Sequence, residues 1–238
     1  MKTKKIFAVL FWIAVWQAVY MIIGKEVLFP SPADTVKALA VLITQPEFYK
    51  TVLFTFIRIV SGFILGTVTG IVLGIFTVSF EVIGDILKPL ISIVRAAPVA
   101  SFIILALAWI KTGMVPVFIS FLIVVPVMWS NISEGISSTD IKLLEMAEVY
   151  DFTLLQKITK IYIPSVRPYF RSAVITGAGL AFKSGVAAEV IASPAFSVGQ
   201  RLYDAKVYME TAELFAWTAV VIVLSIVFEK LLVRFIGR

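Results

Sequence analysis

Six apolar runs dominate this sequence of 238 residues, and each is long enough to cross a lipid bilayer. A helix that spans a bilayer needs roughly 20 predominantly apolar residues. Hydrophobic residues make up 60% of the chain and charged residues 15%, whereas soluble domains carry about 25% charge. The sequence therefore predicts an all-α, polytopic membrane helix bundle forming a single domain, residues 1–238. The runs cover residues 6–23, 52–79, 87–110, 114–130, 172–192 and 212–232.

The basic residues are unevenly distributed around these runs. If the N-terminus is placed in the cytoplasm, the cytoplasmic segments hold twelve Lys and Arg residues and the external segments hold six. Cytoplasmic loops of membrane proteins carry such an excess. Both termini and the polar segment 131–171 are therefore predicted to be cytoplasmic. The run 6–23 follows a basic start, but its length and the lack of a small-x-small site favour a retained span over a signal peptide.

Composition excludes several kinds of chemistry. The chain has no cysteine and no histidine, which rules out disulfides, thiol chemistry, Cys/His metal sites and histidine acid–base catalysis. No Gly-x-x-x-x-Gly-Lys-Ser/Thr phosphate-binding loop is present, so this chain is not expected to bind ATP. A membrane enzyme would need a Ser–Lys or paired-acid site. Lys183 and Ser184 are adjacent, but adjacent helical residues point about 100° apart, which disfavours that alternative.

Small residues recur every fourth position in two of the runs. The second run contains Gly62, Gly66, Gly70 and Gly74, a spacing that lets a neighbouring helix approach closely. It is typical of ordinary tight helix packing, and also of a sliding surface in a moving transporter. The fifth run repeats the spacing in a row of small residues: Ala173, Gly177, Ala181 and Gly185.

Charged residues within the runs are candidates for lining a translocation path: Lys183, Glu189, Arg95 and Arg58. A lysine near the middle of a span costs roughly 2.5–3.5 kcal/mol on insertion scales, so Lys183 is expected to face a water-filled path or a buried acid. Attraction of an anionic or carboxylate-bearing solute is one role for this lysine, and a structural ion pair or a snorkelling side chain is an equal alternative. Glu189 is nearer the external end, where a helix-end charge meeting interfacial water is an equal alternative. Pro98 shortly follows Arg95, and it is expected to break or kink its helix.

The polar segment 131–171 contains two helical patterns. The first covers residues 141–150 and is broken at Asp151. Thr153 and Gln156 form a capping box that starts the second, which is expected to end by Pro164 because the residue before a proline resists helical geometry. The apolar residues of this second helix require a protein groove, either on a partner or beneath the bundle itself. They are Leu154, Leu155, Ile158, Ile161 and Tyr162.

These residues resemble the cytoplasmic signature of ATP-binding-cassette importer permeases. That signature reads Glu-Ala-Ala, three residues, Gly, nine residues, Ile, one residue, Leu-Pro. Here the spacing matches throughout, with Met146, Asp151 and Ile163 replacing Ala, Gly and Leu. Asp tolerates a left-handed backbone better than most residues, so the turn is compatible with the replacement. The chain is most similar to the nitrate, sulfonate and taurine branch, through Phe29-Pro30-Ser31-Pro32, Arg95-Ala96-Ala97-Pro98 and other short motifs.

The resemblance implies a type I importer permease that is not itself an enzyme and binds no cofactor. It implies a separate ATPase subunit carrying ATP and Mg, an extracytoplasmic solute-binding protein, a second permease copy in a homodimer and a bacterial cytoplasmic membrane, with no nucleic acid involved. An ion-coupled secondary transporter is the alternative, but it would need acidic relay residues at the membrane midplane. The resemblance assigns ATPase coupling to Glu145, Ala147, Asp151, Thr153, Leu154, Gln156, Ile161 and Pro164.

Overall fold

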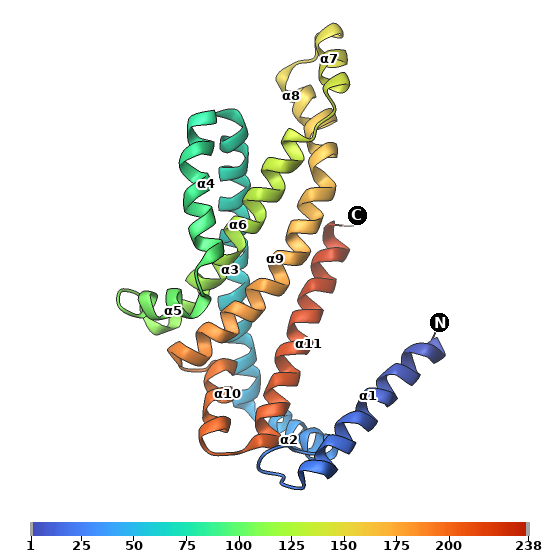
Figure 1. Ribbon diagram of the computed structural model, residues 1–238, viewed down its shortest axis with the longest axis vertical. Helices are drawn as coiled ribbons and strands as arrows, with labels where there is room; N and C mark the ends of the chain where they lie inside the picture. The colour runs from blue at the N-terminus through green and yellow to red at the C-terminus, as the bar shows by residue number, and fades with distance from the viewer. Residues whose placement is uncertain (1, 237–238) are drawn as a thin grey trace.

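The computed structural model describes the backbone of residues 2–236 and the side chains of residues 6–235, and this part of the chain is helical without strands (Figure 1). The all-α prediction is therefore confirmed. Met1 and Arg238, which the predicted domain limits include, lie outside the described residues, as does the contribution of Arg238 to the charge count. The elements are α1 (Lys2–Ile23), α2 (Pro32–Thr44), α3 (Pro46–Ser79), α4 (Glu81–Ala96), α5 (Val99–Leu107), η1 (Thr112–Met114), α6 (Val115–Ser137), α7 (Ile141–Val149), α8 (Leu154–Lys157), η2 (Ile158–Tyr162), α9 (Ile163–Ala192), α10 (Val198–Val207) and α11 (Thr211–Ile236).

Five helices in the described range are long and apolar enough to cross a membrane, and α4 with α5 makes a sixth span if the bent pair is counted as one. The predicted run 87–110 is thus not a straight helix, because α4 and α5 meet at 98°. Pro98 explains the break. It has no N–H to donate, and it holds Ala97 in an extended conformation (φ −75°, ψ 139°), which ends α4.

The glycine row of α3 packs directly against α6. A Cβ placed on Gly62 would lie 2.3 Å from the Val117 carbonyl oxygen, and one on Gly70 would lie 2.4 Å from the Met128 Cβ. Gly66 and Gly74 meet α6 in the same way, one and three turns along. A side chain on any of the four would enter α6, so the row lets α3 and α6 approach closely in this structure.

Helix α9 completes the centre of the bundle by packing on α6 and α3. The Ser120 hydroxyl of α6 donates to the Ala181 carbonyl at 3.2 Å. A Cβ on Gly185 would lie 2.6 Å from that hydroxyl oxygen, so the row of small residues in α9 allows the close approach. The largest buried cluster lies where α3, α6, α9 and α11 meet, and it includes Ile59, Phe63, Val124, Met128, Val174, Phe182 and Phe228.

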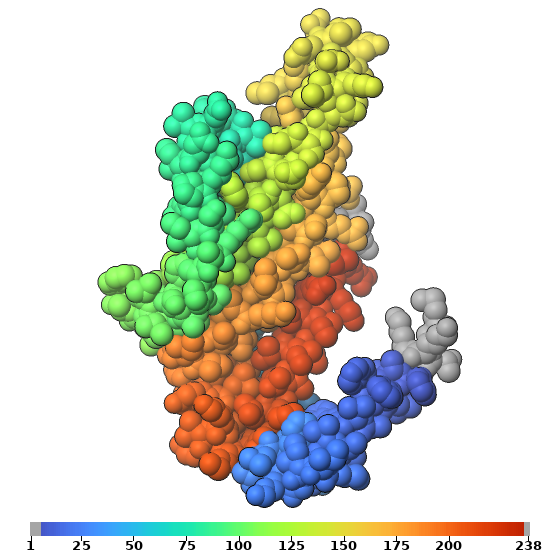
Figure 2. All heavy atoms as spheres, viewed as in Figure 1, coloured from blue at the N-terminus to red at the C-terminus, as the bar shows by residue number. Residues whose placement is uncertain are grey.

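Helix α1 leaves the bundle at an angle (Figures 1 and 2), and none of its apolar window is buried. Its anchor is Trp16, whose indole N–H donates to the Pro30 carbonyl at 3.0 Å and whose ring contacts Phe215. Beyond that point, large side chains such as Phe7 and Trp12 are exposed. Lipid or another protein chain must cover such a surface in the membrane.

The second helix of the polar segment does not end at Pro164. The chain is helical from α8 through η2 into α9, and Pro164 lies in the first turn of α9. The π-helical turn η2 supplies the reason. The Ile163 N–H bonds to the Ile158 carbonyl, five residues back, which widens the turn and accommodates a residue that lacks an N–H. The expectation of a stop before the proline is therefore wrong.

Candidate functional site

The tip of the polar segment is a helical hairpin at one end of the molecule, opposite α2 (Figure 1). Helix α7 begins at Asp140, whose carboxylate accepts from the Lys142 N–H at 2.9 Å. After α7, Asp151 adopts a left-handed backbone (φ 51°), and the Phe152 N–H bonds to the Ala147 carbonyl at 2.8 Å. The tight turn expected from the signature is present with Asp in place of Gly.

The predicted capping box at Thr153 is also present. The Gln156 side chain accepts from the Thr153 N–H at 2.8 Å, and the Thr153 hydroxyl accepts from the Gln156 N–H at 3.3 Å. Lys157 of α8 lies 4.0 Å from Glu148 of α7, which adds an ion pair between the two arms. These contacts hold the two arms of the hairpin in a defined geometry.

The residues of the hairpin divide into buried small ones and exposed apolar ones. Ala147 is fully buried and Ile161 is nearly so, which explains why the signature requires residues of those sizes. By contrast, Val149, Tyr150, Leu154 and Leu155 are 80%, 71%, 74% and 70% exposed. Glu145 also points outward. The alternative that the second helix packs beneath its own bundle does not hold for Leu154 and Leu155.

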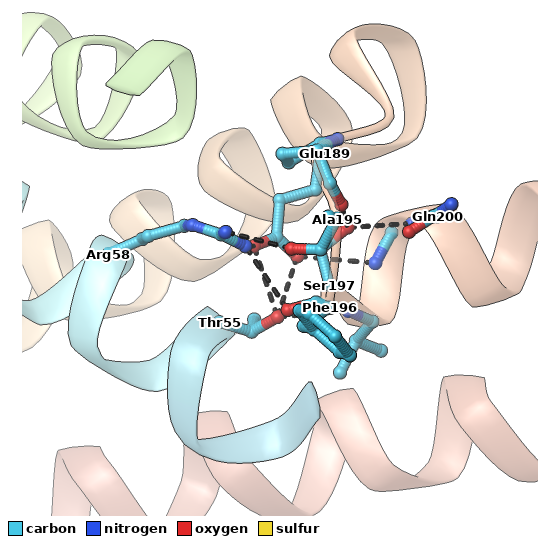
Figure 3. Close-up of polar contacts among 10 residues, drawn as sticks. Thr55, Arg58, Glu189, Ala195, Phe196, Ser197 and Gln200 are labelled. Atoms are coloured by element: carbon cyan, nitrogen blue, oxygen red, sulfur yellow. Dashed lines mark hydrogen bonds and ion pairs between the residues drawn. The ribbon is translucent and has the colours of Figure 1, made fainter. Parts of the chain in front are cut away.

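A second polar cluster lies at the other end of the bundle, where α9, α10 and α3 meet (Figure 3). Glu189 is 0% exposed. Its carboxylate accepts from the Thr55 hydroxyl at 2.8 Å, from the Gly199 N–H at 3.2 Å and from Arg58 Nη1 at 3.3 Å. The expectation of a helix-end charge in interfacial water is therefore wrong for Glu189, which is enclosed and fully hydrogen-bonded.

Arg58 joins this carboxylate to the segment between α9 and α10. Its guanidinium donates to the carbonyls of Ala195 at 2.9 Å and Phe196 at 3.2 Å (Figure 3). That segment contains two non-glycine residues with left-handed backbones, Ser193 (φ 43°) and Phe196 (φ 53°). Such conformations persist only where the surroundings hold them, and Arg58 supplies two of the contacts that do so.

Close packing accompanies the charge pair. A Cβ on Gly199 would lie 2.3 Å from the Glu189 Cβ, so only glycine allows the first turn of α10 to reach the carboxylate. The Val198 N–H donates to the Thr55 oxygen at 2.9 Å. The carboxylate of Glu189 therefore contacts both Arg58 and the N-terminus of α10, which carries a partial positive charge. Both contacts stabilise a buried negative charge. Sequence reasoning missed Gly199 and this use of Thr55, and no local pattern in the sequence pairs them with Glu189.

The two other candidate path residues are placed differently. Arg95 is exposed on α4, and its guanidinium donates to the Pro126 carbonyl of α6 at 3.0 Å. Lys183 is exposed on α9, and the side chains described for residues 6–235 include no acidic group within ion-pair distance of it. A buried acid from this stretch of the chain is thus not its partner. The structure brings Arg58 and Glu189 together and leaves Lys183 and Arg95 apart from them.

Comparisons with known proteins agree with this architecture. Residues 62–238 match the model of the family described as the inner membrane component of binding-protein-dependent transport systems. The putative aliphatic sulfonates transport permease SsuC of Bacillus subtilis is 28% identical over 86% of this chain and 74% of its own length.

Two further relatives show a similar degree of likeness. The nitrate import permease NrtB of Synechococcus elongatus is 26% identical over 82% of this chain and 73% of its own length. The glycine betaine/carnitine permease GbuB of Listeria monocytogenes is 24% identical over 80% and 67%. The family match covers most of the chain, from the second half of α3 onward, and includes α6 and α9. The chain therefore belongs to the family of inner-membrane permease components of binding-protein-dependent ABC transport systems.

Proposed function

We propose that this permease forms one half of a homodimeric importer and that a separate ATPase subunit, carrying ATP and Mg, grips the hairpin of α7 and α8. The observation that carries the proposal is the exposed apolar tip formed by Val149, Tyr150, Leu154 and Leu155. Water is a poor environment for four such side chains at the end of an ordered, capped hairpin. Amphipathic helices with this exposure bind in hydrophobic grooves of other proteins.

Because the helix that starts at the hairpin is continuous, a force on the hairpin can reach the centre of the bundle. Leu154 to Ala192 is one helical stretch that runs from the tip into the centre of the bundle. An ATPase that holds the tip differently in its two nucleotide states would therefore move α9, because a state change is transmitted only through a difference in contact free energy. The signature residues Glu145 and Asp151 shape the gripped surface, while Ala147 and Ile161 hold it together from inside.

The orientation follows from the same assignment. An ATPase works in the cytoplasm, so the tip and the ends of α1 and α11 on that side are cytoplasmic, as the charge count predicts. Helices α2 and α10 then face outward, where a solute-binding protein delivers its cargo. The membrane is a bacterial cytoplasmic membrane.

The solute class we propose is a small anion. Two relatives are described as sulfonate and nitrate permeases, and a third as a glycine betaine/carnitine permease. An anion also suits Lys183, an exposed cation within α9. An ammonium forms charge-assisted hydrogen bonds with oxyanions.

A photo-crosslinking experiment tests the ATPase assignment. The native chain has no cysteine, so a single Leu155→Cys variant can carry a benzophenone maleimide at the tip. We expect a crosslinked product of permease and ATPase in membranes that express both. The matched control is Lys206→Cys on the exposed surface of α10, at the opposite end, which should give no such product. Crosslinking of Leu155→Cys only to other helices of its own chain would overturn the proposal.

The ion-coupled alternative is tested separately. If uptake into cells or vesicles stops on ATP depletion and persists with an ionophore, a separate ATPase drives transport. Uptake that survives ATP depletion and collapses with an ionophore would instead support a secondary transporter.

A further inference from the structure

The exposed faces of the spans in this protein are of two kinds. On α11 the exposed residues are large and apolar, such as Ile222, Val223, Ile226 and Val227, and α3 is similar with Ile64, Leu65 and Val68. These faces suit lipid chains. The outward face of α9 has a different composition, and its residues recur at helical spacing along one line: Ser172, Thr176, Gly179, Lys183 and Ala187.

This face of α9 does not serve the packing of its own chain. A Cβ added at Gly179 would meet nothing within 4 Å, whereas one at Gly185, on the inward side, would collide with α6 and α3. Ser172, Thr176, Lys183 and Ala187 are all exposed. Small residues that are not needed for packing within the chain leave room for something beside the helix.

The position of Lys183 indicates whether lipid, protein or water lies beside this face of α9. It lies nine residues before the end of α9, about 13 Å along the helix. A lysine at such depth against lipid would cost roughly 2.5–3.5 kcal/mol. A dry contact with a second copy would bury it instead, and the remaining residues of the face (Ser172, Thr176, Gly179 and Ala187) offer no acid to neutralise it. A water-filled space would hydrate the ammonium group of Lys183 and avoid both of these costs.

The two-fold symmetry of a homodimer supports the same conclusion. This step rests on the proposed function, of which the homodimer is a part. In a two-fold dimer the surface patch at the interface meets the same patch of the second copy. If the α9 faces look toward the axis, Lys183 faces the same lysine of the second copy. Two like charges resist dry packing, and an anion between them would relieve the repulsion.

We propose that the face of α9 formed by Ser172, Thr176, Gly179, Lys183 and Ala187 lines the translocation path, and that Lys183 forms a subsite for the oxyanion group of the solute. The group is a sulfonate, nitrate or carboxylate, whose oxygens accept charge-assisted hydrogen bonds from an ammonium. Glu189 does not compete for this role, because its carboxylate is turned inward onto Arg58 and Thr55. Lys183 is thus an unneutralised cation in the path.

Thiol labelling of the cysteine-free chain tests the path lining. Thr176→Cys, Gly179→Cys and Ala187→Cys are prepared singly in the permease–ATPase complex in lipid nanodiscs. The probes are the membrane-impermeant reagents 2-sulfonatoethyl methanethiosulfonate, an anion, and 2-(trimethylammonium)ethyl methanethiosulfonate, a cation. We expect both to label the three α9 cysteines, and neither to label the control Val223→Cys on α11.

The ratio of the anionic to the cationic labelling rate reports on the subsite. At Gly179→Cys we expect Lys183→Met to lower this ratio by about tenfold, the effect of removing one nearby charge in a partly hydrated space. Lys183→Arg should preserve the ratio. Lys230→Met, the same change on an exposed lysine of α11, should leave it unchanged.

Each contrary outcome identifies what has failed. Unlabelled α9 cysteines that form disulfides between two copies would show a dry interface and overturn the path lining. If the α9 cysteines are labelled but Lys183→Met leaves the ratio of anionic to cationic labelling rates unchanged, the anion subsite would be overturned. Failure of the ATPase assignment would appear elsewhere, as absence of the crosslink at Leu155→Cys and as labelling that does not respond to ATP.

Discussion

Arg58 and Glu189 are 131 residues apart in the sequence, yet their side chains meet at 3.3 Å at the junction of α3, α9 and α10. The carboxylate is fully buried and the arginine side chain is 14% exposed. Removing one partner of such a buried pair leaves the other charge uncompensated. The pair therefore fixes the C-terminal end of α9 to α3.

Breaking this pair from one side should be more damaging than removing both charges. We expect Arg58→Met to lower the free energy of unfolding by about 3–5 kcal/mol, the usual cost of an uncompensated buried charge. The double variant Arg58→Met/Glu189→Gln should recover part of the loss, because Thr55 and Gly199 still have an oxygen to bond. Thermal unfolding in detergent, followed by tryptophan fluorescence, measures both.

An exposed ion pair supplies the control for that experiment. Lys37 pairs with Asp34 at 3.4 Å, but the lysine side chain is 78% exposed. Lys37→Met should change stability by no more than about 1 kcal/mol, as for most surface pairs. Equal effects of Lys37→Met and Arg58→Met would show that the cluster at Glu189 has no special structural role.

The contact between α3 and α6 should be sensitive to a single methyl group. Gly70→Ala places a Cβ 2.4 Å from the Met128 Cβ and 2.9 Å from the Val125 carbonyl oxygen. Forcing the helices apart should cost about 1–3 kcal/mol, as overpacking does elsewhere. Gly113→Ala is the matched control, since its Cβ would meet nothing within 4 Å. A fluorescence-detected melting curve in detergent that is unchanged for Gly70→Ala would contradict the close contact.

The turn at Asp151 predicts opposite outcomes for two small substitutions. Its φ of 51° suits glycine and penalises a β-branched residue. Asp151→Gly should retain coupling, whereas Asp151→Val should distort the hairpin and lower the solute imported per ATP hydrolysed several-fold. Replacement of Asp151 or Glu145 by lysine should also uncouple hydrolysis from uptake while assembly with the ATPase persists. Coupling at the native level in the valine and lysine variants would argue against the hairpin as the contact.

The π-helical turn should depend on the proline that follows it. Pro164→Ala restores an N–H and allows regular helical bonding through η2, which would rotate the tip relative to α9 by about 100°, one helical residue. Uptake should fall although the ATPase still binds. Pro168→Ala, at a proline inside α9 and outside η2, is the control. Distances between spin labels at Leu155 of the two copies would record the rotation, and unchanged distances would contradict it.

Much of the fold could be predicted because its signals are local. The spans follow from length and apolarity, and the close contact of Gly62, Gly66, Gly70 and Gly74 from a spacing of four. The cap at Thr153 follows from a pattern four residues long. The stop at Pro164 was wrong because the cost of a missing N–H depends on the turn before it. A π turn removed that cost, and its presence is not visible in residue types.

The candidate site was less predictable because its contacts join distant segments. Arg58 and Glu189 could each be recognised as charges within spans, but nothing in a single sequence pairs them. Contact of Glu189 with interfacial water was one of two alternatives, because depth was judged from its distance to the helix end, whereas α10 covers this carboxylate. Lys183 could be singled out from the sequence as a charge within a span, but its role in a translocation path stays a prediction.

The unbroken helix from Leu154 to Ala192 has a geometric consequence for how the permease opens. Its end beside α10 is held at Glu189, so a sideways pull at the tip turns it about that point. A displacement of about 4 Å at Leu154, about 52 Å from the pivot, would move Arg167 by about 2.5 Å but Lys183 by under about 1 Å. The space near the tip would thus widen far more than the space around Lys183, so a pull on the hairpin moves the two ends of the bundle unequally.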